Sequence, residues 1–231
     1  MASPLATLIR NDARQQFRYG IYAAYAFVIG FYITVLVFAA DFLPTWLPGL
    51  IVFTDPAVVG FFFLGALMLL EKGESVRTAL AITPVSAFDY FWSKTITLTG
   101  LAFVSVLVLS LFFHQSSNLP LLMSAVVLTS VQFLGLGVLT AYRFKTVTSY
   151  LMGAAGFLTP VIAPGFIALL DPMPVWAIVI PAASQFRLIL LAIGYGSANL
   201  LEIVAMFAVA SIAAAACVVL ALRRLKQEFG K

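Results

Sequence analysis

The feature that most constrains this chain is the length of its uncharged stretches. Residues 95–142 contain no Asp, Glu, Lys or Arg, and 63% of the 231 residues are hydrophobic while only 10% are charged. A soluble globular domain is about a quarter charged. Because a membrane-crossing helix needs about 20 mostly apolar residues, residues 95–142 must hold two crossings. The sequence therefore predicts an all-α integral membrane protein and excludes a disordered, fibrous or ordinary soluble chain.

The other uncharged stretches complete a single transmembrane domain over 1–231 with six crossings. The second crossing is short, and Thr54-Asp55-Pro56 predicts its start, because a capping side chain followed by proline is typical of a first helical turn. No crossing carries a charge at its centre, which weakens the case for an ion-coupled transporter without excluding it. The predicted crossings are 20–40, 54–70, 95–113, 120–142, 149–170 and 199–222.

Residues 3–19 are predicted to form an amphipathic helix that lies on the membrane surface. Arginines recur at every fourth position, as Arg10, Arg14 and Arg18. Four apolar side chains fall on another side of the same helix: Leu5, Leu8, Ile9 and Phe17. A helix with these two faces lies flat at the interface before the chain enters the bilayer.

The distribution of basic residues predicts the orientation. With the N-terminus inside, 12 of the 13 Lys and Arg residues fall on the cytoplasmic side, and only Arg187 falls outside. Basic residues near short loops are retained in the cytoplasm, so both termini are predicted to be cytoplasmic. The net charge of +4 is accounted for by this orientation signal, and we expect no nucleic-acid partner.

Residues 171–198 are apolar but do not fit a further crossing, which would place the basic C-terminus on the wrong side. We predict an outer re-entrant hairpin, with a break near Pro181, that dips into the bilayer without crossing it. Irregular backbone at that depth requires burial in protein or a cavity. The alternative is an amphipathic helix in an external loop.

Catalytic and metal-binding motifs are missing from the sequence. His114 is the only histidine and Cys217 the only cysteine, and neither has a partner at convincing spacing. A GxxxxGK[ST] phosphate loop is also missing. We therefore expect no catalytic, cofactor or metal site in this chain, and a protein that is not itself an enzyme.

Residues 71–94 form the longest and most patterned of the predicted cytoplasmic loops. Thr83-Pro84 predicts a break between two short helices, and Ser86 can cap the second. That second helix is rich in aromatic residues: Phe88, Tyr90, Phe91 and Trp92. Such an element can protrude and transmit force; alternatively, it is a passive connector with its aromatic rings among the lipid headgroups.

Three segments together resemble the type-2 family of ABC exporter permeases. The segment EKGESVRTALAITPVSAFDYFWSK resembles the family's signature of a Glu-basic pair, a Thr-Pro turn and an aromatic stretch that ends in Lys. IPAASQFRLILLAIGYG is similar to the family's Asn-Pro…Arg…Gly segment, with Ile180 where Asn is usual. RNDARQQFRYGIYAAYAF and FTDPAVVGFFFLGALMLLEK resemble the branch of fluoroquinolone export permeases. The resemblance extends over nearly the whole chain.

The resemblance implies a half-transporter in a prokaryotic plasma membrane. It would pair with a second permease copy or a paralogue, and separate ATPase subunits would bind ATP and Mg and dock on its cytoplasmic loops. Residues 71–94 would be the coupling segment, with six candidate residues: Glu71, Arg77, Thr83, Pro84, Asp89 and Lys94. Independently, a carboxylate at a helix C-terminus opposes the helix dipole, so Glu71 is expected to have a partner such as Lys72, Arg77 or an ATPase residue. Alternatively, Glu71 only marks the end of the membrane.

Candidates for a substrate path are polar side chains within the crossings. Tyr22, Tyr25 and Tyr32 share one side of the first crossing, and Gln132 lies near the middle of the fourth. Helix packing is an alternative role for all four. The implied cargo is a hydrophobic or amphipathic small molecule, such as a fluoroquinolone. Export of haem, lipid or another natural product, or a non-transporting immunity or sensor protein, remain alternatives.

Overall fold

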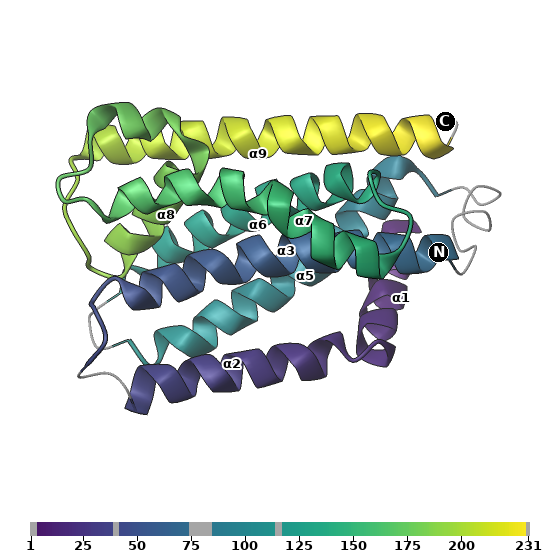
Figure 1. The fold of residues 1–231 in the computed structure, drawn as a ribbon, viewed down its shortest axis with the longest axis horizontal. Coiled ribbons are helices and arrows are strands. Elements are labelled where there is room, and N and C mark those ends of the chain that lie inside the picture. Colours follow the sequence, from purple (N-terminus) through teal and green to yellow (C-terminus); the bar gives the residue numbers. More distant parts are fainter. Residues whose placement is uncertain (1–3, 39–41, 74–84, 114–116, 230–231) are drawn as a thin grey trace.

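The computed structural model describes residues 4–38, 42–73, 85–113 and 117–229, and these form helices without a β-strand. Most helices run along one long axis, and α1 lies at the same end of the molecule as the C-terminal end of α9 (Figure 1). In chain order the helices are α1 Pro4–Arg18, α2 Ile21–Phe38, α3 Leu47–Gly73, α5 Ala87–Ser110, α6 Leu119–Ala141, α7 Val147–Ile162, the 3-10 helices η2 Ala163–Leu169 and η3 Val175–Val179, α8 Pro181–Ala192 and α9 Leu200–Phe229.

Among the described residues, six helices are long and apolar enough to cross a membrane, α7 and η2 together making one of them. This confirms the predicted class of an all-α, multi-pass membrane protein. The crossings α3 and α6 are the most buried and form the centre of the bundle. By contrast, only 17–22% of the residues are buried in the most apolar stretches of α2, of α7 with η2, and of α9.

The second crossing differs from the prediction. Helix α3 begins at Leu47, so Asp55 and Pro56 lie inside it instead of at its start. The Thr54 hydroxyl donates to the Leu50 carbonyl at 2.9 Å, within the same helix, and so does not cap a new one. With 27 residues, α3 is about 40 Å long at about 1.5 Å per residue, which is more than enough to cross the bilayer. The predictions that this crossing is short and that it starts at Thr54-Asp55-Pro56 were therefore wrong.

The third crossing also begins earlier than predicted. Ser86 caps α5 as expected: its hydroxyl accepts from the Asp89 amide at 3.1 Å, and Asp89 accepts from the Ser86 amide at 3.2 Å. The aromatic stretch after Ser86 is thus the first two turns of a crossing helix, because no break interrupts it before Ser110. The predicted break at Thr83-Pro84 lies outside the described residues.

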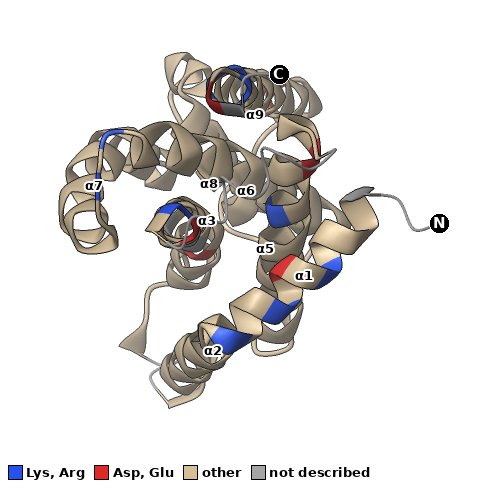
Figure 2. Ribbon diagram, turned by 90° about the vertical axis from the view of Figure 1, so that its right-hand side faces the viewer, with Lys and Arg blue, Asp and Glu red and all other residues tan. Residues whose placement is uncertain are grey.

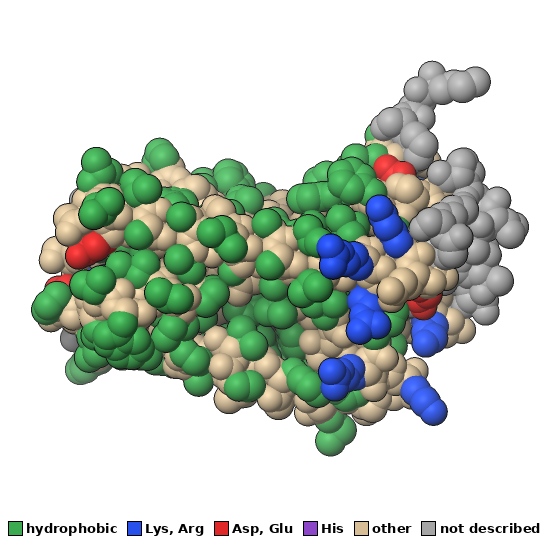
Figure 3. Space-filling view, turned by 90° about the horizontal axis from the view of Figure 1, so that it is seen from above, with side chains coloured by type: hydrophobic (Ala, Val, Ile, Leu, Met, Phe, Trp, Pro, Cys, Tyr) green, Lys and Arg blue, Asp and Glu red, His purple; other side chains and the backbone are tan. Residues whose placement is uncertain are grey.

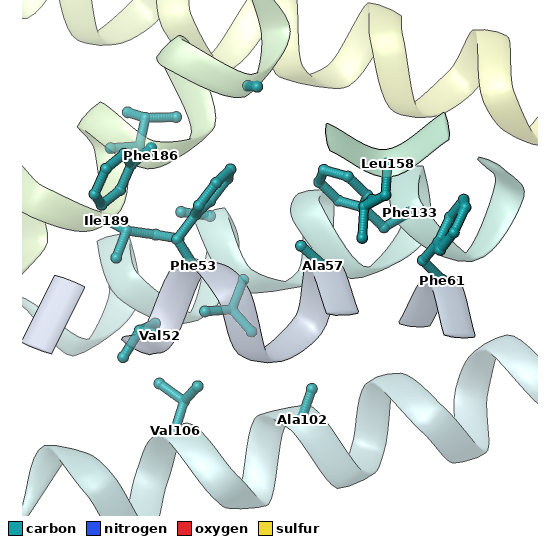
Figure 4. Packing of buried hydrophobic residues seen from close by; sticks show 14 of the residues in the cluster. Val52, Phe53, Ala57, Phe61, Ala102, Val106, Phe133, Leu158, Phe186 and Ile189 are labelled. Atoms are coloured by element: carbon teal, nitrogen blue, oxygen red, sulfur yellow. The ribbon is translucent and has the colours of Figure 1, made fainter. Parts of the chain in front are cut away.

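Aromatic side chains fill the centre of the bundle (Figure 4). The Phe53 ring of α3 stacks on Phe186 of α8 with centroids 4.9 Å apart and meets Phe133 of α6 edge-on at 6.3 Å. Ala57 and Ala102 are also buried, and their small size lets α3, α5 and α6 approach one another. This core includes α8, so part of the outer segment 171–198 belongs to the packed interior of the protein.

Gly137 sets the distance between α3 and α6. A Cβ atom at this position would lie 2.6 Å from the Phe61 carbonyl oxygen, which is backbone and cannot rotate away. Gly137→Ala is therefore expected to destabilise the protein by about 1–3 kcal/mol, measured by thermal unfolding in detergent. Gly100→Ala is the control, since a Cβ there meets no atom within 4 Å. Equal melting temperatures for the two variants would contradict the close contact between α3 and α6.

Candidate functional site

Charge is concentrated at one end of the molecule. Basic side chains gather beside the described part of the C-terminus, and hydrophobic side chains cover most of the remaining length (Figure 3). At the same end, α1 lies across α5 (Figure 2). The sequence of α1 holds three basic residues and one acidic residue. The helices α3 and α5 end and begin here, on either side of residues 74–84. We call this the basic end.

A buried ion cluster joins α1, α3 and α5 at the basic end. The Lys94 ammonium of α5 lies 2.9 Å from Asp12 Oδ1 of α1 and 2.5 Å from Glu71 Oε1 of α3. Tyr90 donates to the second oxygen of Glu71, and Ser93 donates to the second oxygen of Asp12 at 2.6 Å. These five residues, Asp12, Glu71, Tyr90, Ser93 and Lys94, are all buried and are hereafter the ion cluster.

The hydrogen bonding of the ion cluster explains how it can be buried. Each of the four oxygens of Asp12 and Glu71 accepts at least one hydrogen bond within the cluster. Lys94 is only 2% exposed and also lies 4.7 Å from the centroid of the Tyr90 ring. A buried charge is costly unless it is paired and its hydrogen-bonding capacity is met. The cluster meets these conditions only while all three helices stay together.

The predicted coupling residues fall into three groups. Glu71 has a partner, as expected, but this partner is Lys94, which was not among the partners suggested for it, and not its exposed neighbour Lys72. Asp89 caps α5 together with Ser86. Arg77, Thr83 and Pro84 lie outside the described residues.

The sequence did not predict three members of the ion cluster as site residues: Asp12, Tyr90 and Ser93. One signal pointed to Asp12. It stands four positions before Gln16, so these two polar residues share one side of the helix, away from the side of the arginines. In the structure both point into the bundle, where Gln16 donates to the Thr97 hydroxyl at 2.8 Å.

A second polar contact lies deeper in the bundle. The Tyr25 hydroxyl of α2 donates to Asp55 Oδ2 of α3 at 2.6 Å, and both residues are at most 2% exposed. Ser105 of α5 lies beside both, while Asp55 Oδ1 has no hydrogen-bond partner among the described residues. Asp55 is about 24 Å along α3 from Glu71, at about 1.5 Å per residue, which places it well inside the crossing. None of the described ion pairs includes Asp55.

The other predicted path residues do not converge on one site. Tyr22 lies near α1, 3.3 Å from Gln16, and Tyr32 is half-buried on α2. Gln132 accepts a hydrogen bond of 2.8 Å from Gln185 of α8. Gln132 and Tyr25 thus form buried hydrogen bonds between helices, which is the packing role given as the alternative to a substrate path. A role in transport for any of the four residues stays a prediction.

The contact between Tyr25 and Asp55 gives a testable difference between two substitutions. Asp55→Asn keeps an acceptor for the Tyr25 hydroxyl, carries no charge and is expected to leave stability nearly unchanged. Asp55→Ala leaves that hydroxyl buried without an acceptor and is expected to cost about 1–3 kcal/mol. Thermal unfolding of both variants in detergent, with Tyr25→Phe beside them, measures the contact. Equal destabilisation by Asn and Ala would show that Asp55 acts as a charge and not as an acceptor.

Arg187 holds together the opposite end of the molecule. Its guanidinium donates to the carbonyls of Ala168, Leu170 and Ser197 at 3.0–3.1 Å and to Asp171 at 2.7 Å, and the residue is 1% exposed. The hydrogen bond from Arg187, helped by one from the Ser197 amide, lowers the pKa of the Asp171 carboxyl below its ordinary value. Gly196 has φ of +76°, and a Cβ there would lie 2.6 Å from the guanidinium. Glycine thus lets the loop close over Arg187.

The hairpin predicted for residues 171–198 is partly recognisable in the structure. Pro181 is the first residue of α8, so a helix boundary lies where the break was expected, with η3 before it. Helix α8 is almost entirely buried, against α3, α6, α9 and η2. Its entry into the membrane is not established by this packing and stays a prediction.

Within the part of the chain that the structure describes, no group of three or more His, Cys, Asp or Glu residues could hold a metal ion. The acidic residues that do converge, Asp12 and Glu71, already share Lys94. The chemistry that this cluster provides is therefore structural ion pairing, which connects helices.

The chain is similar to known export permeases. Over 111 residues it is 30% identical to fluoroquinolones export permease proteins from two strains of Mycobacterium tuberculosis, which covers 48% of this chain. The match spans about half, 47%, of the length of these curated relatives. No protein-family model matches the chain. No solved structure matches it either. The similarity supports the resemblance stated from the sequence, and with the six apolar helices it fits a membrane permease.

Proposed function

We propose that this chain is the membrane subunit of an ATP-driven exporter in a prokaryotic plasma membrane. Two copies, or this chain and a paralogue, would enclose a path for a hydrophobic or amphipathic small molecule. Separate ATPase subunits would bind ATP and Mg and dock at the basic end, on the cytoplasmic side. The names of the two similar proteins make a fluoroquinolone the first cargo to test.

The ion cluster is the observation that carries this proposal. Helices α3 and α5 flank residues 74–84, and Lys94 joins both of them to α1 through Glu71 and Asp12. A force applied to residues 74–84, which connect α3 and α5, would therefore move three helix ends together and not one loop alone. Closure of the ATPase subunits on ATP would then favour one of two permease states, just as a ligand favours the state that it binds more tightly.

Transport by reconstituted protein tests the function. The chain is produced with and without the ATPase subunit encoded nearest to its gene, and fluoroquinolone uptake into inverted membrane vesicles is measured with ATP. Uptake is expected only when both proteins and ATP are present. Uptake by this chain without an ATPase, or failure of any ATPase subunit to copurify, would contradict the proposal. Uptake of haem or a labelled lipid in place of the drug would correct the cargo alone.

Accessibility labelling tests the orientation. Lys72→Cys at the basic end and Asn199→Cys at the other end are both exposed positions and are made in a Cys217→Ala background. A membrane-impermeant maleimide added to intact cells is expected to label position 199 and not position 72, and inverted vesicles are expected to give the reverse. Labelling of position 72 from outside would place the connecting segment on the wrong side for an ATPase.

A further inference from the structure

The outer side of α1 carries a basic groove that the proposed function does not use. Three exposed residues, Arg10, Arg14 and Arg18, line a shallow, mostly apolar hollow of about 600 Å³ together with Ala13, Phe17 and Tyr22. The arginines take part in none of the ion pairs formed by the described residues. We call this hollow the α1 groove.

The acidic and basic side chains of α1 lie on opposite sides of the helix. Asp12 and Gln16 point into the bundle, where they are held by Lys94, Ser93 and Thr97. The three arginines are exposed and, at about 100° per residue, lie on the opposite side of the helix from Asp12 and Gln16. The groove therefore presents three positive charges with its nearest carboxylate already paired elsewhere, which is complementary to an anion.

The groove also has an apolar part, formed by the rings of Phe17 and Tyr22. Phe17 is 74% exposed, and its ring lies 6.3 Å from that of Tyr22, at the start of the first crossing. Because α2, the first helix long and apolar enough to cross a membrane, begins at Ile21 just after α1, these rings lie beside the start of that helix. A ligand that fits has an anionic head beside an apolar chain.

We propose that the α1 groove binds an anionic phospholipid of the same leaflet. The guanidiniums of Arg10, Arg14 and Arg18 bind the phosphate, and the rings of Phe17 and Tyr22 line the first part of an acyl chain. The inference does not depend on what the protein transports, since it rests only on the surface formed by α1 and the start of α2.

Native mass spectrometry of the full chain in detergent tests the site with phosphatidylglycerol and phosphatidylcholine. The variant R10Q/R14Q/R18Q removes the groove charges. The matched control R223Q/R224Q/K226Q removes three exposed charges of α9 at the same end. Wild type and control are expected to retain phosphatidylglycerol over phosphatidylcholine, and the groove variant to lose at least about tenfold in phosphatidylglycerol affinity. Equal losses in both variants, or no preference between the lipids, would overturn the site.

Two further measurements separate a lipid site from a simple anion site. Phe17→Ser keeps every charge and is expected to weaken phosphatidylglycerol binding several-fold. Inorganic phosphate at millimolar concentration is expected to compete poorly. If phosphate displaces the lipid fully, and Phe17→Ser has no effect, the groove binds anions only and the proposal fails. Melting temperatures of the variants, expected to stay within a few degrees of wild type because all substituted side chains are exposed, show that each has folded.

Discussion

Replacing Lys94 with methionine is expected to destabilise the protein by about 3–5 kcal/mol. Methionine keeps much of the volume but leaves Asp12 and Glu71 buried near each other without their shared cation. Removing one partner of a buried ion pair costs more than the pair contributed, because the remaining charge stays desolvated. Unfolding in detergent, followed by circular dichroism, measures the loss. Lys72→Met is the control, since Lys72 is adjacent to Glu71 in sequence but exposed.

A rescue variant distinguishes charge from shape in the ion cluster. Asp12→Asn and Glu71→Gln, added to Lys94→Met, remove all three charges and keep the side-chain sizes. Stability is expected to recover by more than half, because neutral amides are far less costly to bury than unpaired carboxylates. If the triple variant is as unstable as Lys94→Met alone, packing and not ion pairing accounts for the effect.

The ion cluster also connects stability to the proposed function. In the reconstituted complex, the rescue variant is expected to bind the ATPase subunit but to show weaker stimulation of ATPase activity by fluoroquinolone, since its three helix ends are held by weaker bonds. Normal stimulation in a fully folded rescue variant would mean that the cluster holds the fold together without transmitting force.

The second large effect is expected at Arg187. Arg187→Met should cost about 3 kcal/mol or more, because it leaves three carbonyls and Asp171 without their shared donor. Arg187→Lys should recover only part of this, since an ammonium cannot span four acceptors as a guanidinium does. Limited proteolysis of the end formed by η2, η3 and the 194–199 loop measures the local effect. The exposed Arg223→Met is the control, and similar proteolysis of both variants would contradict the bracing role.

Hydropathy predicted the class of fold well. The uncharged stretches located the six helices of the described residues that are long and apolar enough to cross a membrane, because the cost of placing backbone and charge in hydrocarbon is a local property of each segment. Local hydrogen bonds were predictable in part for the same reason: Ser86 caps α5 as expected, while the reciprocal bond to Asp89, three residues on, was not predicted. A partner for Glu71 could also be inferred, from the helix dipole.

The pairings across helices could not be predicted from the sequence. Lys94 seemed to mark the end of a loop and Asp55 the start of a helix, yet both lie inside crossing helices, with Asp12 and Tyr25 as their partners. Asp12 and Lys94 are 82 positions apart, and no periodicity connects them. Segment hydrophobicity determined how many helices enter the membrane. Only the tertiary structure decided which polar groups of different helices pair with one another. A buried charge is stable only where residues distant in sequence supply its ion pair and hydrogen bonds.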